Sequence, residues 1–291
     1  MERGTQGVLG LLAGNGDLPR LVAEGARAAG WRVVTAAMGP VVPELRGVSD
    51  AYSELALGQL GGVLDVFRRE KATGCVMAGH FAKASVFGGF RPDLTLLGIV
   101  ARLGRQLQDD RALREVARVF EEAGVPVLAV PPFVPAHMAR EGVMTSRRPT
   151  PDEADDIRYG MQVARTTGGL DVGQTVVVRR GVVLAVEAVE GTDRAIERGA
   201  ALGRHGGAGG KGGVVVCKVV KPHQDLRLDL PAVGPQTVET CVRHKVRVLA
   251  VEAQRTIMVD RDKTVRAAND AKLVIVGVPR PEGVPAPPWS A

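Results

Sequence analysis

Aromatic residues are scarce in this chain of 291 residues, at 3% of the sequence. Proteins that bind single-stranded nucleic acids stack the bases on aromatic side chains, and the chain also lacks any run of five basic residues. Both absences argue against a nucleic-acid partner. No apolar stretch approaches the ~20 residues that a transmembrane helix requires. The sequence therefore predicts a soluble protein, or one that contacts a membrane only peripherally.

Cysteine is also rare. Cys75, Cys217 and Cys241 lie far apart in apolar surroundings, and no Cys-x-x-Cys spacing occurs. This usage predicts reduced core residues of a cytoplasmic protein rather than disulfides or zinc ligands. Residues 1–6 are short and polar, so we expect no secretion signal there.

The remaining composition is that of a globular protein, 45% hydrophobic and 24% charged. The length suits two domains. A net charge of +6 favours an anionic partner such as a phosphate, a nucleotide or an acidic membrane surface. The alternative is a solvated surface with scattered charges.

The first half of the chain alternates short apolar runs with amphipathic helices. Residues 7–14 read as a buried strand, residues 18–29 as a helix with one apolar face, and residues 31–38 as a second strand. The scheme recurs twice, ending in an expected strand at residues 125–130. Strands that alternate with helices predict a parallel sheet. We therefore expect a Rossmann-like, doubly wound α/β domain over residues 1–148.

A proline-rich junction separates this part from residues 149–291, which we expect to form a mixed α+β domain. Thr150 followed by Pro151 and acidic residues predicts a capped helix start. Two β-rich runs joined by "RRG" at residues 179–181 predict a hairpin.

The stretch "AGNGDLP" follows the first expected strand. Gly14, Asn15 and Gly16 precede a helix, and the N-terminus of a helix attracts anions. The dinucleotide fingerprint would need a third glycine where Pro19 stands, so an ordinary β-α turn is the alternative. Among the histidines, only His80, after a later strand, is placed like a site residue.

The stretch "LAVEAVEGTD" places Glu187 in an apolar strand, where a lone carboxylate needs a partner. Glu190 and Asp193 follow at the strand end and are able to hold a metal, while Thr192 opens a helix whose amides suit a phosphate. The alternative is that Glu187 pairs with a structural arginine and Thr192 only caps the helix.

In "KVVKPHQDLRLDLPAVG", charged residues alternate with leucines, a pattern that predicts a strand. Asp225, Arg227 and Asp229 would then share one face. Positions four residues apart on a strand are separated by about 13 Å, too far for both carboxylates to bind one Mg²⁺. A metal would need further carboxylates, and the motif around Glu190 is the obvious source. Arg227 suits a phosphate, with Lys218 and Lys221 adding charge; an exposed face of alternating charges is the alternative.

These stretches, together with "DVGQTVVV", resemble the LpxI family, the UDP-2,3-diacylglucosamine pyrophosphatases of lipid A biosynthesis. The resemblance runs in order along nearly the whole chain and is strongest over residues 171–260. It implies two domains with the lipid in a cleft between them. It also implies Mg²⁺-dependent hydrolysis of the substrate's pyrophosphate to lipid X (2,3-diacylglucosamine 1-phosphate) and UMP.

The resemblance puts the family's key acidic residue on Asp229 and its second aspartate on Asp225. We therefore expect catalytic roles for Asp229, Asp225 and Lys221. We expect the substrate to be bound by Gly14, Asn15, Gly16, Thr192, Lys218 and Arg227, and the metal to be bound by Asp229, Glu187, Glu190 and Asp193. The metal is Mg²⁺, with Mn²⁺ as a second choice.

The expected partner is a UDP-linked acylated glucosamine, with peripheral contact to the inner-membrane surface and room for a homo-oligomer. Residues 94–107 are amphipathic, with Arg102 and Arg105 on the polar side. Such a helix covers acyl chains, lies on an anionic membrane or faces the core. Two alternative functions remain: another metal-dependent sugar-nucleotide pyrophosphatase, or a non-catalytic protein that binds nucleotides or lipids.

Overall fold

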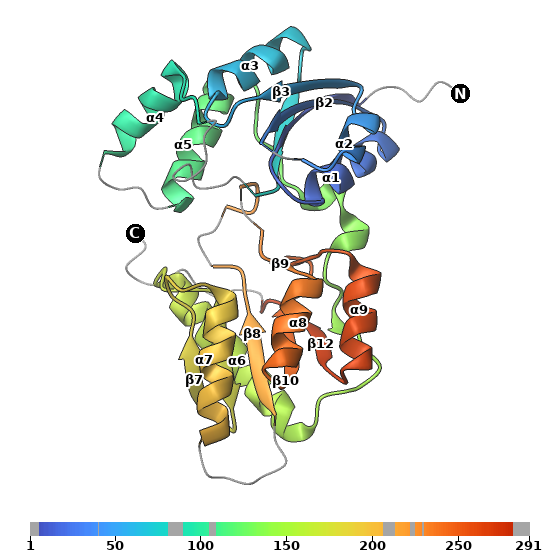
Figure 1. Ribbon diagram of the computed structural model, residues 1–291, viewed down its shortest axis with the longest axis vertical. Coiled ribbons are helices and arrows are strands. Elements are labelled where there is room, and N and C mark those ends of the chain that lie inside the picture. Colours follow the sequence, from blue (N-terminus) through green and yellow to red (C-terminus); the bar gives the residue numbers. More distant parts are fainter. Residues whose placement is uncertain are drawn as a thin grey trace. The chain divides into compact units, whose positions relative to one another are not determined.

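The computed structural model describes residues 6–39, 41–80, 90–104, 109–205, 213–221, 225–228 and 230–281 (Figure 1). The chain divides into two compact units. Unit 1 comprises Met1–Pro135 and Asp225–Asp229, and unit 2 comprises Ala136–Gln224 and Leu230–Ala291. The division thus lies thirteen residues before the expected boundary at residue 148. The intervening residues join unit 2 because their strand β5 pairs there with β12.

Unit 1 is built on a four-stranded parallel sheet in the order β3-β2-β1-β4. Its strands are β1 Gly7–Ala13, β2 Trp31–Met38, β3 Ala51–Leu55 and β4 Gly74–Ala78. The connection from β3 to β4 therefore crosses β2 and β1, as in a doubly wound sheet. The strand expected at residues 125–130 is reduced to a single parallel bridge between Cys75 and Val127.

Helices cover both faces of this sheet, and Figure 1 shows α1 and α3 on opposite sides of it. The helices of unit 1 are α1 Leu18–Ala28, α2 Glu44–Gly47, α3 Leu60–Arg69, α4 Leu94–Leu103 and α5 Asp109–Glu122, followed by a 3₁₀ turn at Pro131–Phe133. The expected Rossmann-like doubly wound domain is confirmed.

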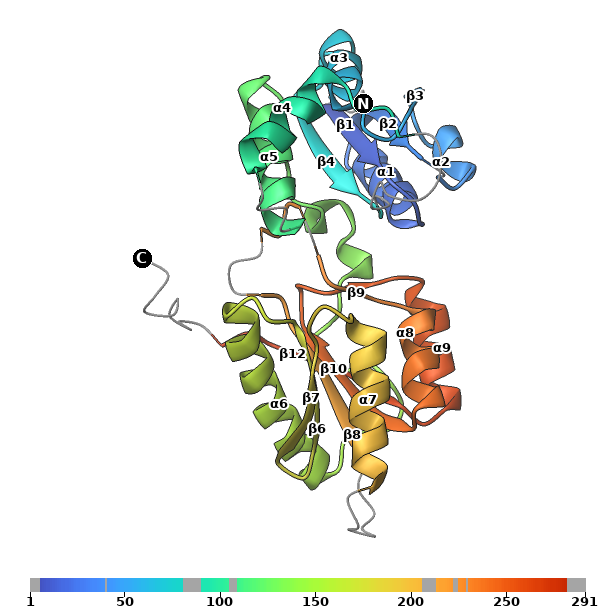
Figure 2. The ribbon, with the colours of Figure 1, turned by 60° about the vertical axis from the view of Figure 1, so that its left-hand side comes forward.

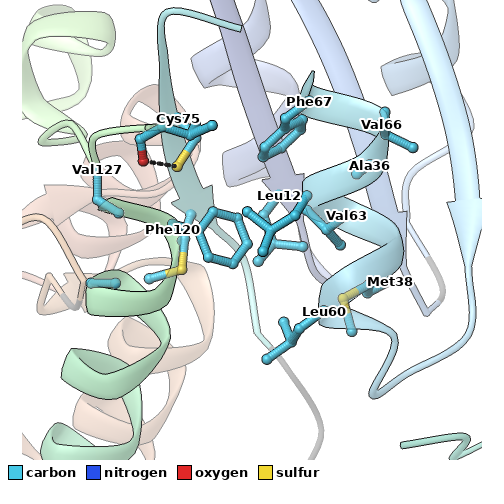
Figure 3. Close-up of a cluster of buried hydrophobic side chains, with 14 of the residues drawn as sticks. Leu12, Ala36, Met38, Leu60, Val63, Val66, Phe67, Cys75, Phe120 and Val127 are labelled. Atoms are coloured by element: carbon cyan, nitrogen blue, oxygen red, sulfur yellow. Dashed lines mark hydrogen bonds between the residues drawn. The ribbon is translucent and has the colours of Figure 1, made fainter. Parts of the chain in front are cut away.

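A large core cluster of unit 1 lies between the sheet and the α3 and α5 helices, where Phe120 of α5 faces Leu12 of β1 (Figure 3). Phe67 and Phe120 meet edge to face, with ring centroids 6.1 Å apart. Cys75 lies in the same cluster, and burial raises the pKa of its thiol to about 12, so the thiol stays protonated. The three cysteines are free and buried, as the sequence predicts.

Unit 2 is built on a six-stranded mixed sheet in the order β5-β12-β10-β8-β6-β7. Its strands are β5 Gly142–Val143, β6 Thr175–Arg179, β7 Val182–Val186, β8 Val214–Lys218, β10 Val246–Glu252 and β12 Val274–Val278. The strands β8, β10 and β12 run parallel, and β6 is antiparallel to β7 and β8. Positive φ angles of 51° at Arg180 and 70° at Gly181 close the predicted hairpin between β6 and β7.

Figure 2 shows the strands of this sheet between α6 on one side and α7, α8 and α9 on the other. These helices are α6 Pro151–Gly169, α7 Thr192–His205, α8 Pro235–Arg243 and α9 Arg261–Asp270. The structure also contains a two-stranded pair, β9 Ala232–Val233 with β11 Ile257–Met258, and a 3₁₀ turn at Pro135–His137. The predicted start of α6 is confirmed, because Thr150 and Glu153 form a reciprocal capping box.

The strand expected at residues 225–230 is a wrong prediction. Residues 226–228 form a turn, closed by a hydrogen bond from the Leu228 amide to the Asp225 carbonyl at 2.9 Å. The Asp225 carboxylate also accepts from the Arg227 amide at 3.0 Å, so the aspartate folds the chain back on itself. Leu228 packs on the core of unit 1. In the described part of the chain, no helix is long and apolar enough to cross a membrane.

Candidate functional site

The turn after β1 lies at the carboxyl ends of β1 and β4, where open α/β sheets bind their ligands. The Gly14 amide donates to the Ala78 carbonyl at 2.8 Å, and Asn15 and His80 exchange two backbone hydrogen bonds of 2.9 and 2.8 Å. The structure therefore brings His80 beside the predicted glycine turn. Because the amides of Gly14 and Asn15 already donate to carbonyls, an anion here would be bound by amides further along, from Gly16 into α1.

Gly79 makes this close approach between the two strand ends possible, and the sequence reading missed it. Its φ is 95°, and a Cβ atom at this position would lie 2.7 Å from the carbonyl carbon of Gly14. Only glycine adopts this conformation at no cost and leaves room for the neighbouring backbone. The signal was present in the sequence, as a glycine directly after an apolar strand.

The turn of residues 225–228 holds Asp225 and Arg227 together, as expected, but with a different geometry. Arg227 donates from Nε and Nη2 to the Asp225 carboxylate at 3.0 and 2.6 Å, and from Nη1 to Glu121 of α5 at 2.7 Å. The hydrogen bonds from Arg227 hold the pKa of Asp225 below its usual range. Asp225 is thus an ionised partner of Arg227, while Asp229 lies outside the described residues.

In unit 2, Glu187 follows β7 and is 8% exposed. The Thr192 hydroxyl donates to its Oε1 at 3.0 Å, and the Thr175 hydroxyl lies 3.4 Å from that of Thr192. The second carboxylate oxygen, Oε2, is buried and has no hydrogen-bond partner among the described residues. The partner of Glu187 is therefore a threonine hydroxyl rather than the structural arginine of the alternative reading.

The two other acids of this motif lie in different surroundings. Glu190 accepts hydrogen bonds from Arg198 at 2.5 Å and from the Ala188 amide at 3.1 Å. The hydrogen bond from Arg198 lowers the pKa of Glu190. Asp193 is exposed in the first turn of α7, where a carboxylate stabilises the helix. The structure thus groups Glu187 with Thr192 and directs Glu190 toward Arg198.

The two lysines of the motif lie at and just beyond the end of β8. Lys218 sits opposite Thr175 in the sheet register, is 8% exposed, and donates from Nζ to the Ala232 carbonyl at 3.2 Å. Lys221 forms an ion pair of 2.7 Å with Asp171. Lys218 and Glu187 are therefore both buried near Thr175.

A buried ion pair lies at the end of the neighbouring strand β10, and the sequence reading missed it. Glu252 is 0% exposed and accepts from Arg165 of α6 at 2.9 Å and from the Val220 amide at 3.1 Å. Through these two bonds, Glu252 ties the segment that contains Lys221 to the α6 helix. The one signal in the sequence is an acid in a strand that is otherwise apolar.

The described residues contain no group of three or more histidine, cysteine or acidic side chains that could hold a metal ion. Mg²⁺ prefers oxygen ligands and is commonly bound by one or two carboxylates together with substrate phosphates. The free, buried Oε2 of Glu187 fits that requirement. The four-carboxylate metal shell and the ligand cleft between the domains stay predictions.

Two family models match the chain: the LpxI N-terminal domain over residues 8–137 and the LpxI C-terminal domain over residues 140–276. One relative, the UDP-2,3-diacylglucosamine pyrophosphatase LpxI of Caulobacter vibrioides, is 33% identical over 284 residues, which cover 93% of this chain and 97% of the relative. The chain belongs to the LpxI family. Between the two LpxI models lie residues 138–139, close to where the compact units divide.

Similarity to solved structures is weak. A CobK precorrin-6A reductase is 15% identical, with a TM-score of 0.33, over 97% of this chain and 90% of the other. The ADP complex of the N5-carboxyaminoimidazole ribonucleotide synthetase purK is 10% identical, with a TM-score of 0.29, over 65% and 40% of the two chains. TM-scores this low do not support a structural relationship, so membership of the LpxI family rests on the sequence matches alone.

Proposed function

We propose that this protein hydrolyses the pyrophosphate of UDP-2,3-diacylglucosamine, releasing lipid X and UMP, in lipid A biosynthesis. The observation that carries the proposal is the match to an LpxI pyrophosphatase along 97% of that relative's length. A match of this extent includes both units. The net charge of +6 suits a substrate with a negatively charged pyrophosphate.

We assign the pyrophosphate contacts to Lys218, Lys221 and Arg227, because cationic groups offset charge that develops on phosphate oxygens. Two of these residues each form an ion pair that a phosphate is able to replace. Lys221 pairs with Asp171, whose side chain is 55% exposed, and ion pairs at the surface contribute little free energy. Arg227 is 41% exposed and bridges Asp225 and Glu121, so a phosphate is able to take the place of Glu121 while Asp225 holds the guanidinium.

The proposed cofactor is Mg²⁺, with Mn²⁺ as a substitute. Its proposed ligands are Glu187, through the buried Oε2, and Asp229 and Asp193, which come from the family resemblance. Bound Mg²⁺ would offset the charge on the pyrophosphate oxygens. Glu190 is the weaker candidate, because Arg198 already engages its carboxylate.

The two aspartates of the motif take different proposed roles. The hydrogen bonds from Arg227 lower the pKa of Asp225. A carboxylate with a lowered pKa is a weak base. The role of Asp225 is therefore to position Arg227. Asp229 is left as the group that accepts the proton of the attacking water.

The test is hydrolysis of UDP-2,3-diacylglucosamine in detergent micelles, with the products identified by mass spectrometry. We expect lipid X and UMP from the wild type with Mg²⁺, and loss of both with EDTA or in Asp229→Asn. Asp155→Asn is the matched control, because Asp155 is an exposed helix acid that pairs with its neighbour Arg158. Cleavage of an unacylated UDP-sugar alone would replace the lipid assignment with a broader pyrophosphatase. Tight binding of the UDP-lipid without turnover would favour a binding protein.

A further inference from the structure

The motif "DVGQTVVV", residues 171–178, leads from α6 into β6 and supports the backbone of Glu187. A Cβ atom at Gly173 would lie 1.9 Å from the Glu187 carbonyl oxygen, so only a glycine leaves room for this close approach. Two residues on, the Thr175 carbonyl accepts a hydrogen bond of 2.8 Å from the Glu187 amide. The motif therefore fixes Glu187 at both its carbonyl and its amide, and leaves the side chain only its own rotations.

Thr175, the first residue of β6, is 0% exposed and lies opposite Lys218 of β8 in the sheet register. The α7 helix, which begins at Thr192, packs on β6 and β7 (Figure 2). This packing brings the Thr175 hydroxyl to 3.4 Å from the hydroxyl of Thr192. A buried hydroxyl needs a hydrogen-bond partner, and Thr192 supplies one.

The two threonine hydroxyls and the Glu187 carboxylate form a relay with one direction. The Thr192 hydroxyl has a single hydrogen and donates it to Oε1 of Glu187 at 3.0 Å. In the contact between the two threonines, Thr175 must therefore be the donor. Thr175 thus donates to Thr192, and Thr192 donates to Glu187. Hydrogen bonds in such a chain polarise and strengthen one another.

The relay engages one oxygen of Glu187 and leaves the other, Oε2, buried and without a partner among the described residues. A threonine at the start of a helix commonly turns its hydroxyl oxygen toward the amides of the first turn. The hydrogen bond from Thr175 engages the oxygen of Thr192 instead and directs its hydrogen to Glu187. Without Thr175, the Thr192 hydroxyl is free to turn away, and the carboxylate loses its fixed orientation.

We propose that Thr175 is a positioning residue: acting through Thr192, it holds Oε1 of Glu187 and keeps Oε2 available to the metal. The inference rests on the proposed function to the extent that Glu187 is a metal ligand. Groups that hydrogen-bond to metal-binding side chains orient them, and the loss of one commonly costs about 10–100-fold in metal affinity or activity.

The test compares Thr175→Val, which keeps the shape of the side chain but removes the hydroxyl, with Thr175→Ser, which keeps the hydroxyl. The probe is Mn²⁺ alone, whose electron paramagnetic resonance signal falls on binding. We expect Thr175→Val to weaken Mn²⁺ binding by about tenfold or more, and Thr175→Ser to restore most of it. Thr256→Val is the matched control, because Thr256 is also 0% exposed but its hydroxyl has no partner among the described residues. Equal Mn²⁺ binding by Thr175→Val and Thr256→Val overturns the inference.

A double-mutant cycle separates positioning from a purely structural role. On substrate in detergent micelles, Thr175→Val should lower kcat by about tenfold in the wild-type background. In the Glu187→Gln background it should lower kcat by less than about twofold, because the carboxylate through which it acts is already gone. Equal losses in the two backgrounds would make Thr175 a structural residue and overturn the inference. Circular dichroism checks that each variant is folded.

The same measurements separate this inference from the proposed function. A wild type that hydrolyses the substrate, with Thr175→Val at the same rate, overturns the inference and leaves the proposed function standing. A wild type that is inactive, but whose binding of Mn²⁺ depends on Thr175, overturns the proposed function and leaves the relay standing. A wild type with neither hydrolysis nor Mn²⁺ binding overturns both.

Discussion

The hydroxyl of Thr192 donates to the carboxylate of Glu187 at 3.0 Å, across the turn that joins β7 to α7. One oxygen of a buried carboxylate is thereby satisfied, while the other has no partner among the described residues. A buried, unsatisfied carboxylate oxygen costs free energy of folding, and natural proteins keep such groups where they serve a function. The unsatisfied oxygen therefore lowers the stability of unit 2 and, in the proposed function, serves as a metal ligand.

Glu187→Gln keeps the shape of the side chain and the acceptor for Thr192 but removes the charge. We expect Mg²⁺-dependent hydrolysis to fall by about 10²–10³-fold, the effect of losing one group that stabilises charge in the transition state. The melting temperature without metal should be equal to or above that of the wild type, because a buried charge is removed. Added Mg²⁺ should raise the melting temperature of the wild type only. A variant with full activity would exclude Glu187 as a ligand.

Arg227→Gln removes the main cause of the lowered pKa of Asp225. A carboxylate with a depressed pKa stabilises the fold at pH above its unfolded value, about 3.9, and this stabilisation is lost as the pH falls through the folded pKa. The variant should therefore lose stability relative to the wild type near neutral pH, and the difference should vanish in acid. Carboxyl NMR should show the pKa of Asp225 rising toward 3.9. Glu121→Gln is the control, since it breaks the other contact of Arg227 and should leave Asp225 titrating low.

Arg165→Met leaves the fully buried Glu252 without its closest cation. Removing one partner of a buried ion pair costs about 3–5 kcal/mol, because the other charge stays in an apolar environment. Urea unfolding should report that loss. Arg243→Met, which breaks an exposed pair on α8, should cost less than about 1 kcal/mol. Equal losses in the two variants would mean that Glu252 is compensated by other groups, such as Arg280 at 3.8 Å.

Local signals in the sequence were sufficient for much of the fold. The capping box of Thr150 and the hairpin at Arg180 and Gly181 depend on neighbouring residues, so their sequence patterns are reliable. The turn at Asp225 shows the limit of such patterns. Its alternation of charged residues and leucines also fits a strand, but the aspartate side chain binds the backbone two residues on and closes a turn instead.

The candidate site was harder to predict because its contacts join distant residues. Glu252 and Arg165 are separated by 87 positions, and no local pattern connects them. Glu187 was recognised as a buried acid that needs a partner, yet the identity of that partner, Thr192, depends on how the chain turns after β7. Sequence reasoning thus identified the unusual residues but not their pairings.

Gly79 and Gly39 allow a matched test of the backbone contact between the segment after β1 and the segment after β4. Their φ angles are almost equal, at 95° and 93°. A Cβ atom at Gly79 would lie 2.7 Å from the Gly14 backbone, whereas a Cβ atom at Gly39 would have no described atom within 4 Å. Gly39→Ala should cost about 1–3 kcal/mol from backbone strain alone. Gly79→Ala should cost a further ~1–3 kcal/mol from the clash, because the turn must open. Urea unfolding of both variants measures the difference in the free energy of unfolding. Equal costs would show that the backbone of Gly14 and Asn15 moves aside without a loss of stability. Hydrogen exchange at the Gly14 and Asn15 amides should quicken only in Gly79→Ala, since these amides donate to the segment that the new methyl group displaces.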